Sequence, residues 1–171
     1  MKYILKSSVL YRKDSPVARI GRRLGTAERD IYVPDGTYMM HTRIADSADS
    51  TGDVRSRRYI LEDLRNHTEI EAVPGYAEDE DPKVYGWPLS HMPRTDHADF
   101  KIMDQPYRLV MLNSQNYVLY GEDGKAAVQI VHRGISGGWN IEAGRQFSPA
   151  LLCGLFVFCR YIESENEFPV V

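Results

Sequence analysis

The chain has 171 residues, of which 43% are hydrophobic and 26% are charged. These values are ordinary for a folded globular protein, and the length suits one domain with a substantial core. The formal net charge of −3 at pH 7 argues against nucleic acid as the main partner. Proteins that bind nucleic acids usually have a clear basic excess.

The first part of the chain consists of short β-rich runs separated by turn residues. Runs of this kind, bounded by Gly, Pro, Asp or Ser, are typical of strands. We predict strands over residues 3–6, 9–11, 17–21, 31–33, 37–44, 58–62 and 68–73. A good turn signal, Pro34-Asp35-Gly36, separates two of these runs.

A long segment, residues 75–98, interrupts this pattern. It contains an acidic run at residues 78–81, several prolines and Trp87, and we predict that it is a loop insertion. Loops of this length are uncommon inside compact domains and are often functional or mobile. Trp87 stands in a Gly-Trp-Pro turn, where it could anchor the loop or serve as an exposed recognition residue.

Strand signals resume after this segment. We predict strands over residues 100–103, 107–111, 117–120, 126–132 and 139–143. With the earlier runs this makes about a dozen strands at close spacing. The pattern predicts a mostly β domain, a sandwich or a barrel, rather than alternating βαβ units.

The last predicted element is a helix at residues 148–161. Ser148 is a suitable N-cap, and Pro149 fits the first helical turn. Residues 150–159 are apolar on every face of such a helix, so protein or lipid must enclose it. A membrane span needs roughly 20 apolar residues, about twice the length of this run. We therefore predict a core helix wrapped by strands, and no transmembrane segment.

The cysteines and the N-terminus indicate a compartment. Cys153 and Cys159 both lie in the predicted helix, about 9 Å apart along its axis and pointing in different directions, which is too far for a disulfide. Buried free thiols fit a reducing compartment. Lys2 and Lys6 flank a very short apolar run, which is not the pattern of a signal peptide. We expect a cytoplasmic protein.

Three segments have a family likeness. They are the hairpin at residues 117–130, the strand entry Gly137-Gly138-Trp139-Asn140-Ile141, and Phe147-Ser148-Pro149 leading into the apolar residues 151–159. In this order they resemble the tubby C-terminal-like superfamily, which includes tubby proteins, plant LURP-one-related proteins, phospholipid scramblases and small bacterial relatives. The resemblance implies a closed antiparallel β-barrel of about twelve strands wrapped around a central hydrophobic C-terminal helix. Residues 1–171 would then form a single domain, in which the segment 75–98 has no counterpart.

The candidate binding residues are arginines in the first half of the chain. The six candidates belong to the basic half of the chain, which also contains Arg29, and they are Arg19, Arg22, Arg23, Arg55, Arg57 and Arg58. Guanidinium groups suit phosphates, so these residues predict a site for anionic lipid headgroups or another anion. Tubby proteins bind phosphoinositides through basic residues, but none of those positions can be matched to this chain, and no role is carried over. The alternative is a scattered basic surface with ion pairs between strands.

A second hypothesis places a divalent metal in the long loop. Its ligands would be His91, Asp96, His97 and Asp99, because imidazoles and carboxylates bind such ions. The spacing of the two histidines matches no standard metal motif, and a solvated loop explains the same residues.

No established catalytic motif is present. Residues 134–138 superficially resemble the nucleophile loop of trypsin-like proteases, but Ile135 precedes Ser136 where that loop has Asp. A tight turn explains these glycines better. We therefore expect a non-enzymatic binding module without a cofactor, for anionic lipid or a protein partner. The alternative is a metal-dependent protein or enzyme that uses the loop at residues 91–99.

Overall fold

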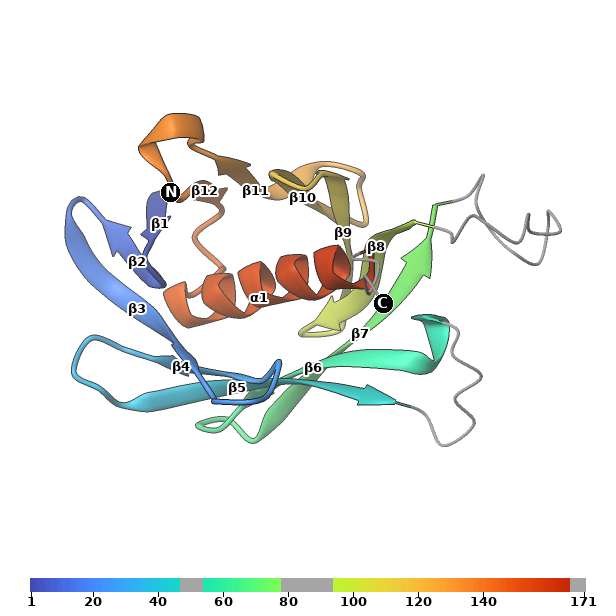
Figure 1. Cartoon of the computed structure of the whole chain (residues 1–171), viewed down its shortest axis with the longest axis horizontal. Helices are drawn as coiled ribbons and strands as arrows, with labels where there is room; N and C mark the ends of the chain where they lie inside the picture. The colour runs from blue at the N-terminus through green and yellow to red at the C-terminus, as the bar shows by residue number, and fades with distance from the viewer. Residues whose placement is uncertain (47–53, 78–93, 167–171) are drawn as a thin grey trace, which may run out of the picture.

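The computed structural model describes residues 1–46, 54–77 and 94–166. Twelve antiparallel strands form one closed barrel, in which each strand pairs with its neighbours in the sequence and β12 pairs with β1 (Figure 1). The strands are β1 (Lys2–Lys6), β2 (Val9–Arg12), β3 (Ser15–Arg22), β4 (Arg29–Tyr32), β5 (Tyr38–Asp46), β6 (Arg57–Asp63), β7 (Thr68–Tyr76), β8 (Thr95–Ile102), β9 (Gln105–Asn113), β10 (Asn116–Gly121), β11 (Ala126–His132) and β12 (Trp139–Ala143). Short 3-10 helices η1 (Val54–Ser56) and η3 (Gly134–Ser136) lie in two connections, and the helix α1 (Pro149–Glu165) follows β12.

The predicted fold class is confirmed. Each of the twelve predicted runs overlaps a strand of the barrel, and the predicted helix is α1. The helix continues to Glu165, beyond its predicted end at Tyr161, because Tyr161 and Ile162 are buried and extend its apolar surface. In the part of the chain that the structure describes, no helix has the length and apolar content needed to cross a bilayer.

The segment 75–98 is not wholly a loop. Its first residues, Gly75 and Tyr76, belong to β7, and residues 95–98 belong to β8. Its middle part, with the acidic run 78–81 and Trp87, lies outside the described residues. The glycines, prolines and acidic residues of this segment therefore predicted a loop, although its two ends belong to the paired strands β7 and β8.

The core of the barrel is α1 itself, which runs through the interior (Figure 1). All residues from Ala150 to Cys159 are buried, and both cysteines are free thiols. Burial raises the pKa of the Cys153 thiol to about 12, so this group stays protonated near neutral pH. Gly154 allows a close approach of the helix to the wall, since a Cβ atom there would come within 2.5 Å of a Leu61 methyl group on β6.

Aromatic side chains fill the space between α1 and the wall around Phe158. Its ring lies 5.9 Å from that of Tyr59 on β6 and 6.0 Å from that of Phe100 on β8, centroid to centroid. Phe158 is fully buried. Such rings pack favourably edge to face, and they fix the helix relative to two separate strands.

Both ends of α1 have defined caps. At the start, the Ser148 hydroxyl accepts a hydrogen bond from the backbone N–H of Leu151 at 3.2 Å, as predicted for an N-cap. At the end, the Asn166 side-chain amide donates to the carbonyl of Thr95 and accepts from its N–H, both at 2.9 Å. The side chain of Asn166 thus attaches the end of the helix to the start of β8.

We expect Phe158→Ala to lower the free energy of unfolding by about 3–5 kcal/mol, because it leaves a cavity between α1 and the wall. Urea denaturation measures this loss. Leu112→Ala on β9 is the matched control, since Leu112 is 54% exposed and its truncation should change stability by less than about 0.5 kcal/mol. Similar losses for both variants would contradict the central position of α1.

Candidate anion-binding cleft

A cleft of about 530 Å³ lies between the C-terminal half of α1 and the barrel wall. We call it the arginine cleft, after Arg22, Arg29 and Arg160, which line it from β3, β4 and α1. The rest of its described lining is apolar or carries hydroxyl groups: Leu5, Ser7, Ser8, Ile20, Ala27, Gly138, Trp139, Phe156, Val157, Tyr161 and Ser164. Among these described lining residues there is no carboxylate.

Two of these arginines face each other across neighbouring strands. Arg22 and Arg29 are direct partners in the register of β3 and β4, and like charges in that position destabilise a sheet. The Arg29 guanidinium donates to two backbone carbonyls, those of Thr26 at 3.0 Å and Glu28 at 2.7 Å. Arg22 is exposed and has no hydrogen bond or ion pair with any described residue. Neither arginine therefore forms an ion pair with a carboxylate of the described chain.

A second like-charged pair in the barrel, unlike the arginine pair, has a counter-charge. Glu62 on β6 faces Glu69 on β7, and the Arg43 side chain bridges them with distances of 2.9 and 3.4 Å. The barrel thus places a counter-charge between two opposed glutamates. The arginine pair lacks an equivalent, so the cleft has the electrostatics of an anion site.

The connection between β3 and β4 is held on both sides. On the side of the helix, the Tyr161 hydroxyl donates to the carbonyl of Ala27 at 3.0 Å. On the other side, Asp30 accepts from Arg23 at 3.0 Å and lies 2.9 Å from His41 Nδ1. These contacts fix the connection that positions Arg22 and Arg29.

The ionisation of Asp30 follows from the same contacts. Burial raises the pKa of this carboxyl, but hydrogen bonds from Arg23, His41 and Tyr38 outweigh burial, and the net pKa lies below its ordinary value. Asp30 is therefore a carboxylate at neutral pH. Burial raises the pKa of the Tyr38 hydroxyl, and the neighbouring Asp30 carboxylate raises it further, to about 12.

Of the six arginines predicted from the sequence, only Arg22 lines the cleft. Arg23 pairs with Asp30 and Glu28 instead, so it serves the connection between β3 and β4. Arg19 lies 5.0 Å from the ring centroid of Tyr32. These positions follow from strand alternation, which turns Arg19 away from the side that holds Arg22.

The other three predicted arginines lie at η1 and the start of β6. Arg55 stacks on the ring of Tyr76 at 5.1 Å. Arg58 donates to Glu71 at 2.8 Å, and Arg57 is paired with Glu165 near the end of α1. The structure therefore does not bring the two arginine groups together in one cleft.

Arg29 and Arg160 are the cleft residues that the list of candidates lacked. Arg160 had a usable signal, because it is the sole charged residue between positions 150 and 162 of an otherwise apolar helix. It forms an ion pair with Glu163 one turn further along α1.

Trp139 forms the apolar end of the cleft. Its ring lies 4.8 Å from that of Phe156, and its buried Nε1–H has no acceptor among the described residues. Gly138 precedes it with a φ of +80°, and a Cβ atom there would lie 2.4 Å from the carbonyl oxygen of Leu5. Glycine is thus required at this position, and it lets the strand entry approach β1 closely.

The proposed metal ligands are only partly within the described residues, since His91 lies outside them. Asp96 lies 2.6 Å from His97 Nδ1, whereas Asp99 lies 4.0 Å from His97 Nε2. The two carboxylates thus face different ring nitrogens, which point away from each other. Across the described ranges, no three His, Cys, Asp or Glu side chains are arranged to hold a metal ion. The metal hypothesis stays a prediction.

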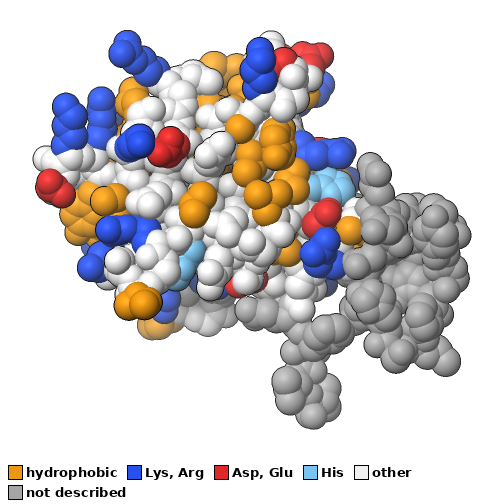
Figure 2. Space-filling model, turned by 90° about the horizontal axis from the view of Figure 1, so that it is seen from above, with side chains coloured by type: hydrophobic (Ala, Val, Ile, Leu, Met, Phe, Trp, Pro, Cys, Tyr) orange, Lys and Arg blue, Asp and Glu red, His pale blue; other side chains and the backbone are white. Residues whose placement is uncertain are grey.

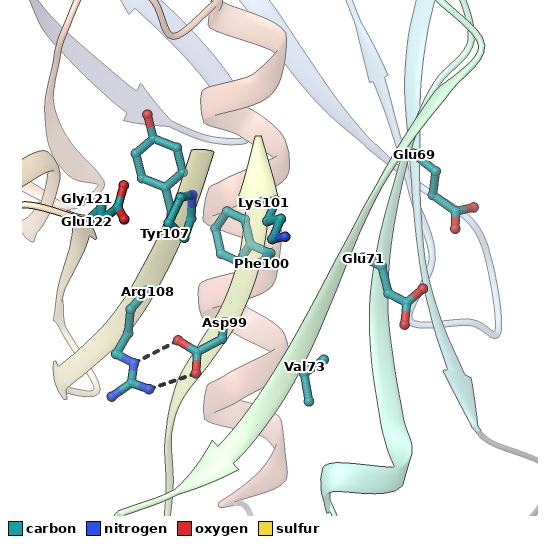
Figure 3. Close-up of a pocket in the computed structure, with 11 residues that line it drawn as sticks. Glu69, Glu71, Val73, Asp99, Phe100, Lys101, Tyr107, Arg108, Gly121 and Glu122 are labelled. Carbon is teal, nitrogen blue, oxygen red and sulfur yellow. Dashed lines mark hydrogen bonds and ion pairs between the residues drawn. The ribbon is translucent and has the colours of Figure 1, made fainter. Parts of the chain in front are cut away.

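A second cavity, of about 620 Å³, lies on β7, β8 and β9 (Figure 3). Its carboxylates are largely neutralised within the barrel. Asp99 accepts two hydrogen bonds from Arg108, at 2.7 and 2.8 Å. Glu69 and Glu71 are paired with arginines of β5 and β6. The arginine cleft, where Arg22 and Arg29 have no ion pair with a described carboxylate, is therefore the stronger candidate.

We expect Asp30→Asn to destabilise the protein by about 1.5–3 kcal/mol at pH 7, because the variant loses hydrogen bonds to a charged group. The pKa of Asp30 is lowered from 3.8 on folding. Its contribution is therefore present above pH 3.8 and is lost as the pH falls through the lower folded value. Urea denaturation of both proteins between pH 7 and the acid limit measures the difference. A difference that grows on acidification would contradict the assignment.

Comparisons of the chain with protein-family models, with curated proteins and with solved structures find no match.

Proposed function

We propose that this protein is a non-enzymatic binding module and that the arginine cleft holds the anionic headgroup of a lipid. The observation that supports this most is the Arg22–Arg29 pair, which faces the cleft without a counter-charge among the described residues. A bound phosphate would supply that charge, as Arg43 does for the opposed glutamates.

The chemistry of the lining suits such a ligand. Guanidinium groups donate several hydrogen bonds in a planar fork and recognise phosphate oxygens in pairs. Ser7 and Ser8 add hydroxyl groups at the turn between β1 and β2. The described lining offers hydroxyls and guanidiniums but no histidine, carboxylate or thiol, which favours binding over catalysis.

The distribution of charge also supports a local site. On the face seen in Figure 2, Lys and Arg side chains stand singly or in small groups among apolar and uncharged ones. They do not make a continuous basic surface on this face. Binding through a defined cleft accounts for an anionic ligand on a chain whose net charge is −3.

Membership of the tubby C-terminal-like superfamily and a cytoplasmic location are part of this proposal. The closed barrel of twelve strands around one helix supports the first. The two free, buried cysteines support the second. Neither feature identifies the ligand, because function depends on sites rather than on folds.

We expect Arg22→Gln to weaken binding to anionic vesicles about tenfold or more, since a hydrogen bond to a charged group contributes roughly 1.5–3 kcal/mol. Co-sedimentation with phosphatidylcholine vesicles, with and without a phosphoinositide, measures this. Arg19→Gln is the matched control, because it removes the same charge from the same strand outside the cleft. Equal, negligible sedimentation of the wild type with both kinds of vesicle would refute the proposal.

Arg22→Gln should also stabilise the unliganded protein, by a few tenths to about 1 kcal/mol, because it removes one of two opposed like charges. Thermal or urea unfolding checks this in the same samples. A structural role for Arg22 predicts a loss of stability instead, so the two explanations of weakened binding are separable.

A further inference from the structure

The polarity of the arginine cleft changes along its length. Phe156, Arg160 and Ser164 line it at intervals of four residues, so they lie on one face of α1 over about two helical turns. Val157 and Tyr161 follow the same order beside them. The helix thus passes from apolar to polar and charged side chains in the direction of its C-terminus.

The barrel wall shows the same division. Leu5 on β1 and Trp139 on β12 are direct partners in the sheet and form an apolar part of the lining. Arg22 and Arg29 form a basic part on β3 and β4. The cleft therefore has an apolar part and a cationic part, each built from strands and from the helix.

A charged headgroup alone would occupy only one of these parts. The apolar part is lined by residues deep in the protein, since Leu5 is 2%, Val157 4% and Phe156 8% exposed. The surface of a bilayer does not reach such residues, whereas one hydrocarbon chain can lie against them.

We infer that the ligand is a single-chain anionic amphiphile, taken up as a monomer with its chain against Phe156 and Trp139 and its anionic group at Arg22 and Arg29. This inference rests on the proposed function and deepens it, because it names the ligand class. The volume of about 530 Å³ lies within the range of small-molecule pockets, roughly 300–1,000 Å³. The site then acts as a carrier or sensor of the free amphiphile.

The test is a chain-length series of alkyl phosphates, from butyl to decyl, kept below the concentrations at which they form micelles. Each methylene that enters the cleft should strengthen binding about fourfold, which corresponds to ~0.8 kcal/mol. Titration calorimetry with the full-length protein measures the affinity for each alkyl phosphate. Tryptophan fluorescence of a Trp87→Phe variant reports on Trp139, and its emission should shift when a long chain binds. Inorganic phosphate and decyltrimethylammonium are the controls for the two halves of the ligand.

The expected result is a steep increase of affinity with chain length and at least a tenfold preference for decyl phosphate over decyltrimethylammonium. Arg22→Gln should reduce that preference and keep the dependence on chain length, whereas Arg19→Gln should change neither. Equal affinities for butyl and decyl phosphate would overturn the inference. If anionic vesicles still bind through Arg22 in that case, the proposed headgroup site stands and only its apolar extension fails. If neither probe binds, both fail.

Discussion

A helix that is apolar on all sides must be enclosed, and the closure of this barrel follows from that constraint. Residues 150–159 are buried without exception, so the strands have to surround the helix completely. An open sheet would leave one side of α1 in water, whereas a closed barrel covers it and also removes unpaired strand edges. Gly154 shows how tight the fit is, because even a methyl group there would clash with Leu61. Closure of the barrel and burial of the helix are therefore one requirement.

Polar side chains occur at the C-terminal end of α1, and most of those in the described chain form hydrogen bonds or ion pairs with the barrel wall or within the helix. Asn166 pairs with the backbone of Thr95, and Tyr161 bonds to Thr42 and to the carbonyl of Ala27. Burial raises the pKa of Glu165, although Arg57 beside it favours the charged form. Polar groups are costly to bury unpaired, so such pairing is what a stable end requires. Against this background, an opposed arginine pair without a counter-charge in the described chain is the exception. Departures from local consistency occur most often at functional sites.

The strands and the helix could be predicted from the sequence because their signals are local, whereas these signals left a sandwich and a barrel equally open, and closure was implied only by the family resemblance. Turn residues delimit every strand, and an apolar run with Ser148 before it specifies the helix. The candidate site could not be predicted to the same degree, because it depends on register and on strand alternation. Arg22 and Arg23 are neighbours in the sequence, yet only Arg22 lines the cleft, while Arg23 pairs with Asp30. Arg29 and Arg160 join Arg22 only after the sheet closes around α1. Pairing partners of this kind are not visible in a single sequence without the barrel.

The hairpin of β3 and β4 contains the strongest argument that the arginine pair is functional. Two carboxylates, Glu28 and Asp30, flank Arg29 in the sequence, and strand alternation places the Asp30 side chain on the opposite face of β4 from Arg29. Both contact Arg23 instead, at 3.3 and 3.0 Å, and His41 lies beside them. These two carboxylates thus pair with Arg23 and His41 and hold the connection in place, and neither forms an ion pair with Arg22 or Arg29. Opposed like charges destabilise a sheet, whereas an opposite-charge pair at the same position would contribute roughly 0.2–1 kcal/mol of stability. That cost is explained if an anion from outside the chain completes the site.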